Sequence, residues 1–99
     1  CWGHNDAALV PDIGIAASFD PVALDCACAD LVIAAPSLRG NAISDKDEAH
    51  EHECTCGHHH HKGDDKFRIV HPDTNWKAGV EYGEQIGLGS RSYELINVR

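Results

Sequence analysis

Cysteine and histidine side chains crowd one stretch of this sequence, between residues 50 and 61. They alternate with other residues at first and then form a run of four histidines. The set is His50, His52, Cys54, Cys56, His58, His59, His60 and His61. Thiolate and imidazole donors suit Zn²⁺, Ni²⁺ or Cu⁺ better than Mg²⁺ or Ca²⁺. We therefore predict a Zn or Ni site here, and the neighbouring acids would concentrate cations near it.

The alternation alone does not build a tetrahedral metal site. Same-side residues of an extended chain lie about 6.6–6.8 Å apart, whereas tetrahedral zinc holds its donor atoms about 3.8 Å from one another. The segment must therefore curl, and Gly57 and Gly63 favour this. Two other interpretations stay open: a solvated His-rich insertion that binds metal loosely, and an engineered tag, against which the internal position of the four histidines argues.

The other cysteines give weaker signals. Cys1 and His4 have a C-x₂-H spacing that could contribute to a metal or cluster site, or could belong to a frayed terminus. Cys26 and Cys28 resemble a ligand pair, but on a helix residues two apart point about 200° from each other and cannot chelate one ion. We predict that both are small core residues, and that His71, before a proline, is a turn residue.

The composition limits the class of protein. The 99 residues include 42% hydrophobic and 24% charged side chains, as in one small globular domain. The net charge of −8 argues against nucleic-acid and anionic-membrane partners. No apolar run approaches about 18 residues, so no transmembrane helix is expected. Five cysteines with C-x-C spacings do not suit a secreted disulfide framework, which predicts a reducing, cytoplasmic location.

The middle of the chain differs in composition from both flanks. Residues 45–65 carry seven acids, two bases and six of the eight histidines. They contain no Val, Ile, Leu, Phe, Trp or Tyr, so they cannot contribute a core face. We predict that residues 45–65 form a long exposed loop. This loop is the main part of a His/Cys/acid-rich insertion at residues 41–66, within a single domain or C-terminal domain fragment spanning residues 1–99.

The N-terminal part predicts a strand followed by a helix. Residues 13–18 are a short apolar run that is consistent with a buried strand. Asp20 followed by Pro21 is a helix start, because the acid can cap the first turn and proline is tolerated at the first position. The sequence is then apolar nearly all round to Ala35, before Pro36, which is typical of a buried helix.

The C-terminal part predicts a helix followed by a strand. A helix capped by Asp73 or Thr74 runs to about Ile86, with its core stripe on one face and a close-approach position at Gly83. Gly87 and Gly89 stand where a helix terminator belongs, and residues 92–98 alternate weakly like a strand. Residues 67–70 are too short to assign. The expected fold is therefore α/β, a small βα…αβ arrangement with a minimal sheet, as part of a larger domain.

Several stretches of the sequence resemble one protein family. They are VPDIGIAASFDPVALD at 10–25, DLV at 30–32, His71-Pro72 with Trp76, GLGSR at 87–91 and YEL at 93–95. Together they resemble the C-terminal region of the uncharacterised iron–sulphur-centre proteins of anaerobic bacteria and archaea. The resemblance omits about residues 40–66. It implies an upstream ferredoxin-like module with two 4Fe-4S cluster motifs, none of which this chain contains.

Two functions follow, and a third is disfavoured. The first is a C-terminal structural segment of an iron–sulphur-centre, electron-transfer protein, packed against the N-terminal remainder of that protein and carrying the metal-binding loop. In that case the helix at 22–35 should keep an exposed apolar face. The alternative is a metal-sequestering or metal-delivery module that acts through residues 50–61. An enzyme is the least favoured, since no complete catalytic set is visible.

Overall fold

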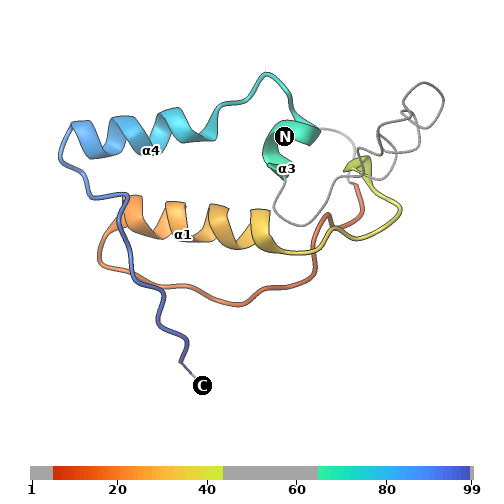
Figure 1. Cartoon of the computed structure of the whole chain (residues 1–99), viewed down its shortest axis with the longest axis horizontal. Coiled ribbons are helices and arrows are strands. Elements are labelled where there is room, and N and C mark those ends of the chain that lie inside the picture. The colour runs from red at the N-terminus through yellow and green to blue at the C-terminus, as the bar shows by residue number, and fades with distance from the viewer. Residues whose placement is uncertain (1–5, 44–64, 99) are drawn as a thin grey trace.

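The computed structural model of the chain describes residues 6–43 and 65–98. Its helices in those ranges are α1 (Pro21–Ala34), α3 (Lys66–Val70) and α4 (Trp76–Gln85). Figure 1 shows α1 and α4 side by side and running in opposite directions, with α3 beside the C-terminal end of α1. The N-terminal segment before α1 runs along the opposite side of that helix from α4. These three helices position the residues on either side of segment 44–64.

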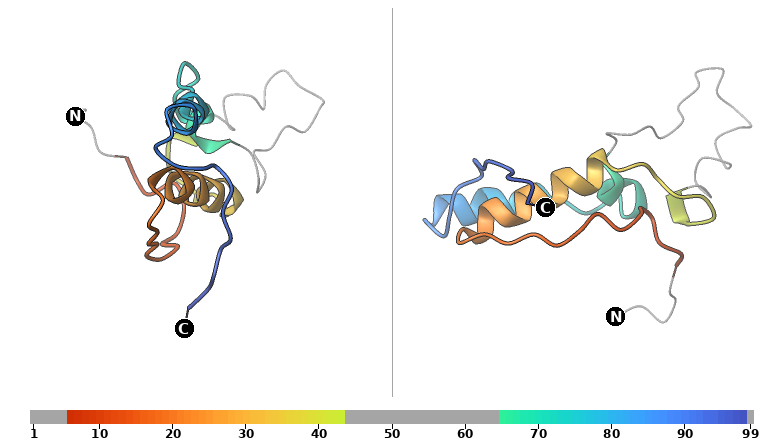
Figure 2. Two further views of the ribbon diagram at one scale, coloured as in Figure 1. Left: turned by 90° about the vertical axis from the view of Figure 1, so that its left-hand side faces the viewer. Right: turned by 90° about the horizontal axis from the view of Figure 1, so that it is seen from below.

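The predicted α/β class is wrong, because the described residues form a small all-α structure without strands. A strand needs a neighbouring strand to bond its backbone N–H and C=O groups. Within the two described ranges, residues 13–18 run alone beneath α1, and residues 92–98 lead away from the helices (Figure 2). Gly14 also has a φ of 150°, far from the value of about −120 to −140° that a regular strand requires.

The predicted first helix is confirmed as α1. The Asp20 carboxylate accepts a hydrogen bond from the backbone N–H of Ala23 at 3.0 Å, which caps the first turn, and Pro21 opens the helix. The helix ends at Ala34, shortly before Pro36. It supplies nearly all of the apolar core of the described residues: Val22, Ala23, Cys26, Ala27 and Ala29, with Ile43 as the sixth member.

The second predicted helix is confirmed as α4, but its start was misplaced. Neither Asp73 nor Thr74 caps it, because the Thr74 hydroxyl instead donates to the carbonyl of His71 at 2.7 Å and closes a turn. The end was predicted correctly. Gly87 has a positive φ of 76°, and the N–H of Leu88 bonds to the carbonyl of Gly83 at 2.9 Å, as in a Schellman motif.

Gly83 is also the point of closest approach between the two long helices, as the sequence predicted. A Cβ at this position would lie 3.0 Å from a methyl group of Val22. The absence of a side chain therefore lets α4 pack directly on the first turn of α1. Of the residues in α4, Gly83 is the one that is buried, while Trp76 and Val80 of the predicted core stripe are half-buried.

Candidate functional site

The predicted metal ligands lie outside the described residues. His50, His52, Cys54, Cys56 and the run His58–His61 all fall within 44–64, and Cys1 and His4 fall within 1–5. The metal site predicted for these residues therefore stays a prediction. In the ranges 6–43 and 65–98, no group of three or more His, Cys, Asp or Glu side chains is gathered in a way that could hold a metal ion.

The two ends of the predicted insertion are described, and they are deeply buried. Asn41 and Ile43 stand just before residues 44–64, and Lys66 stands just after them. These three are the most completely buried side chains of the described residues, with 1%, 1% and 2% of their surface exposed. The prediction of an exposed loop concerns residues 45–65, of which the structure describes only Asp65, a half-buried residue.

Asn41 ties the first end to the N-terminal segment. Its side-chain amide donates to the carbonyls of Ala8 at 3.0 Å and Leu38 at 2.8 Å, and its oxygen accepts from the backbone N–H of Ile43 at 3.0 Å. Next to it, the N–H of Ala42 donates to the Asp6 carboxylate at 2.7 Å. A buried amide with this many partners holds its backbone in one conformation.

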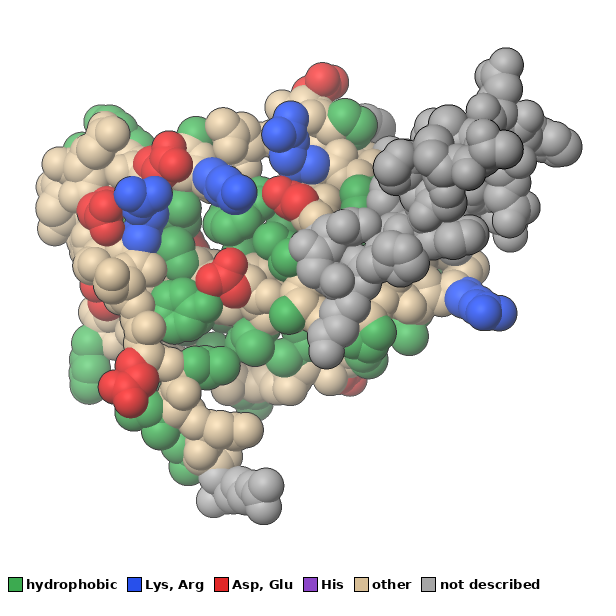
Figure 3. Space-filling view, viewed as in Figure 1, with side chains coloured by type: hydrophobic (Ala, Val, Ile, Leu, Met, Phe, Trp, Pro, Cys, Tyr) green, Lys and Arg blue, Asp and Glu red, His purple; other side chains and the backbone are tan. Residues whose placement is uncertain are grey.

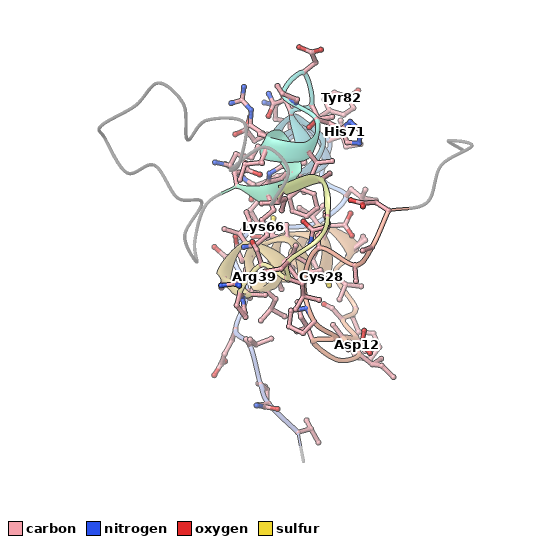
Figure 4. The ribbon with its side chains drawn as sticks, turned by 90° about the vertical axis from the view of Figure 1, so that its right-hand side faces the viewer. Asp12, Cys28, Arg39, Lys66, His71 and Tyr82 are labelled. Atoms are coloured by element: carbon pink, nitrogen blue, oxygen red, sulfur yellow. The ribbon has the colours of Figure 1, made fainter. Side chains whose placement is uncertain are left out.

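Lys66 ties the second end to the end of α1. Its ammonium donates to the carbonyl of Ile33 at 2.6 Å. The last carbonyls of a helix have no N–H partner within the helix and carry partial negative charge, so a cation is favourable there. Figure 4 shows Lys66 between α3 and the end of α1. We call Asn41, Ile43 and Lys66, with Asp65, the stem.

Asp65 completes the stem by linking α3 to α4. One carboxylate oxygen accepts from the N–H of Arg68 at 3.3 Å and caps α3, while the other accepts from the indole N–H of Trp76 at 3.1 Å. The rings of Trp76 and Phe67 then lie 5.9 Å apart at 53°. Asp65, four residues after His61, is thus hydrogen-bonded to the first turn of each C-terminal helix.

An open apolar groove lies directly beside the stem. A hollow of about 570 Å³ is lined mainly by Leu9, Val32, Phe67, Val70 and Trp76, with Lys66 and His71 among its polar residues. A second hollow of about 290 Å³ shares Val32, Phe67 and Trp76 with the first. Figure 3 shows apolar side chains in the depression between α1 and α4. The groove is therefore open and lined mainly by apolar side chains.

The two helical cysteines have opposite environments. Cys26 is buried, as predicted, and burial followed by the negative charge of Asp30 raises the pKa of its thiol, so the group stays protonated and inert. The prediction that Cys28 is also a core residue is wrong. It is exposed and lines the smaller hollow, because residues two apart on α1 face different sides. His71 ends α3 at a turn, as predicted.

The residues after α4 are fastened to both long helices by charged side chains. The N–H of Ser90 donates to the Asp20 carboxylate at 2.8 Å, and Arg91 forms ion pairs with Glu84 at 3.1 Å and Glu81 at 3.4 Å. The hydrogen bonds from the backbone N–H and the side chain of Arg91 hold the pKa of Glu84 below its ordinary value.

The last of these contacts joins the tail to the middle of α1. The phenol of Tyr93 donates to the Asp30 carboxylate at 2.6 Å, and this hydrogen bond raises the pKa of Tyr93. Partners 63 and 70 residues apart leave no local signal in the sequence, so Tyr93 and Ser90 were missed. This cluster is structural, because its carboxylates accept hydrogen bonds from N–H and O–H donors of the tail.

No family model, curated protein or solved structure matches this chain. The resemblance to iron–sulphur-centre proteins therefore stays a prediction. Among the described helices, none is both long and apolar enough to cross a membrane.

Proposed function

We propose that this chain binds a soft divalent metal, Zn²⁺ or Ni²⁺, through the segment at residues 50–61, and that the helices serve as its anchor. The ligands would be Cys54 and Cys56 with two of His50, His52 and His58–His61. Because thiolate ligands are required, the protein would act in a reducing compartment such as the cytoplasm. A module of this kind sequesters a metal ion or delivers it to another protein.

The observation that carries the proposal is the burial of the stem. A segment that only solvates the surface gains nothing from fixed ends, and its flanking residues are ordinarily exposed. Here Asn41 and Lys66, which stand on either side of residues 44–64, are buried side chains and make part-buried hydrogen bonds to Ala8 and Ile33. Fixed ends reduce the number of conformations of the intervening chain, so ordering the ligands around an ion costs less entropy.

Calorimetric titration of the full chain with Zn²⁺ and with Ni²⁺, under reducing conditions at pH 7.5, tests the proposal. We expect about one ion per chain. The double substitution Cys54→Ser, Cys56→Ser should cost far more affinity than any single His→Ala substitution, because the four-histidine run offers substitutes. Cys28→Ser is the matched control, since this cysteine is exposed but lies on α1. Equal binding by the double variant and the control would reject a specific site.

Two further measurements sharpen the test. Affinity should fall as the pH drops through about 6.5, where histidine ligands become protonated. Replacing the stem lysine, Lys66→Met, should weaken binding about two- to tenfold, the equivalent of one lost buried hydrogen bond. Lys77→Met, which changes an exposed lysine of α4, should leave the affinity unchanged.

A second candidate is the structural segment of an iron–sulphur-centre protein that the sequence resemblance implies. It is favoured by the exposure of large apolar side chains and by the incomplete cover of α1, where Cys28 and Ala34 are exposed. In such a protein the 4Fe-4S clusters would belong to the N-terminal remainder and not to this chain. The gene sequence upstream of Cys1 decides between the two candidates, since two C-x₂-C-x₂-C-x₃-C-P motifs there would support the second.

A further inference from the structure

The segment that follows α4 is fastened to both ends of one stretch of α1. The backbone N–H of Ser90 donates to the Asp20 carboxylate at the start of α1 at 2.8 Å, and the phenol of Tyr93 donates to Asp30 farther along the helix at 2.6 Å. Figures 1 and 2 show the chain turning back after α4 and passing beside α1. We call residues 89–93 the strap.

Carboxylates supply the contacts that hold the strap. Within residues 6–43 and 65–98, no backbone-to-backbone hydrogen bond joins the strap to another segment. Its bonds end instead on Asp20, Asp30, Glu81 and Glu84, the last two of which pair with Arg91. These contacts are exposed, and exposed hydrogen bonds and ion pairs each contribute little to stability. The strap can therefore open at a lower cost in free energy than the helices can unfold.

The strap approaches the start of α1 closely at Gly89. A Cβ at this position would overlap the Asp20 carboxylate, so only a residue without a side chain allows the approach. The next residue, Ser90, then has its N–H on the same carboxylate. A single methyl group at Gly89 should therefore be enough to move the strap away from α1.

Cys26 lies on the side of α1 that the strap follows. It precedes Asp30 by four residues, so both side chains project from one face of the helix, and Tyr93 reaches that face through Asp30. Electrostatics support this placement: burial, followed by the charge of Asp30, raises the pKa of the Cys26 thiol, whereas the charge of Arg91 lowers it. The pKa of Tyr93 is raised first by its hydrogen bond to Asp30 and also by Cys26. Two side chains of the strap thus lie within electrostatic reach of a thiol that is only 8% exposed.

We propose that the strap opens as one unit while α1 and α4 stay packed, and that its opening uncovers the side of α1 that bears Cys26. With the strap closed, this side of the helix is shielded from solvent. With the strap open, access to it depends on the few carboxylate contacts described above rather than on unfolding of the core. The device does not depend on the metal-binding segment.

Alkylation of the full chain with iodoacetamide tests the strap, with fragment-ion mass spectrometry assigning the label to Cys26 or Cys28. A chelator is present, and Cys28 is the internal reference because it is exposed. We expect Cys26 to react much more slowly than Cys28, at a rate that low concentrations of urea do not change, since opening the strap exposes little surface. Tyr93→Phe should accelerate the reaction of Cys26 about two- to fivefold. Tyr82→Phe, which changes an exposed tyrosine of α4, should not.

Gly89→Ala is a second probe, because its methyl group would overlap the Asp20 carboxylate. It should accelerate the labelling of Cys26 at least as much as Tyr93→Phe does, while circular dichroism shows unchanged helices. Gly79→Ala is the matched control, since a Cβ there meets no atom within 4 Å. Labelling of Cys26 that rises with urea in parallel with global unfolding overturns the proposal, and so does labelling that neither variant accelerates. Each of these results leaves the metal titration unaffected.

Discussion

The two long helices, α1 and α4, pack against each other but contribute to the fold in different ways. α1 buries five residues and is capped by a side chain, while α4 buries only Gly83 and has no side-chain hydrogen bond at its cap residue, Asn75. The outer face of α4 carries charged residues such as Lys77 and Glu81, and α1 is apolar on most sides. α1 is therefore the centre of the structure, and α4 is a cover on one of its faces.

This difference shows where stability resides. An amphipathic helix of ten residues is marginal by itself, so α4 depends on its contact with α1. α1 in turn has few large side chains in the core, since alanine and cysteine make up four of its five buried residues. Close backbone approach replaces large side chains, and substitutions at the contact should have larger effects than substitutions at the ends of the helices.

The largest effect is expected for Gly83→Leu. Its Cβ would lie 3.0 Å from Val22, and the rest of the side chain would separate α4 from α1. Overpacking of this kind costs about 1–3 kcal/mol in the free energy of unfolding. Gly79→Leu is the matched control in the same helix, because a Cβ there meets no atom within 4 Å. Chemical denaturation followed by circular dichroism measures both, and equal stabilities would show that the contact does not support the fold.

The next effect is expected at the helix starts. Asp20→Ala removes a carboxylate that accepts from both Ala23 and Ser90, so it should lower the melting temperature clearly. Asn75→Ala removes no side-chain cap bond and should change the melting temperature little. Thermal melts of the two variants beside the wild type make the comparison. If Asn75→Ala were the more damaging, α4 rather than α1 would be the centre of the structure.

The lowered pKa of the Asp20 carboxylate also predicts that the stability of the fold depends on pH. Hydrogen bonds from the backbone N–H groups of Ala23 and Ser90 hold the pKa of Asp20 below its ordinary value of 3.8. Its contribution to stability is therefore complete above that ordinary value and is lost as the pH falls through the lower, folded-state pKa. Melting temperatures measured between pH 7 and pH 2 should fall less for Asp20→Asn than for the wild type. Parallel curves would mean that other acids determine the acid sensitivity.

The smallest effect is expected for Tyr93→Phe, which removes only the hydrogen bond to Asp30. The phenol is partly exposed, so the loss should be about 0.5–1 kcal/mol in the free energy of unfolding. Tyr82→Phe is the control, because Tyr82 lies on the outer side of α4 (Figure 4). Amide hydrogen exchange of residues 90–95 should accelerate only in Tyr93→Phe. Unchanged exchange would show that the tail is held by Ser90 and Arg91 alone.

Local features of the sequence predicted both long helices. Asp20-Pro21 marks the start of α1 and Gly87 marks the end of α4. Such start and stop signals act on the adjacent turn of the helix, so they can be recognised in the sequence without knowledge of the fold. Gly83 was predicted as a close approach from its place on the apolar stripe of its helix. The start of α4 was misplaced because the Thr74 hydroxyl bonds to His71, and a cap and a turn compete for the same side chain.

Tertiary structure decided the remaining features. The apolar runs at 13–18 and 92–98 satisfy the pattern of strands, yet a strand exists only where another strand supplies its hydrogen bonds, and no local pattern specifies that neighbour. Burial of Lys66 and Asn41 depends likewise on partners such as Ile33 and Ala8, each 33 residues away. The sequence by itself determined the two long helices, but not α3, and where the cysteine and histidine side chains cluster. Only the packing of α1, α3 and α4 determined that the stem of that cluster is held in the interior.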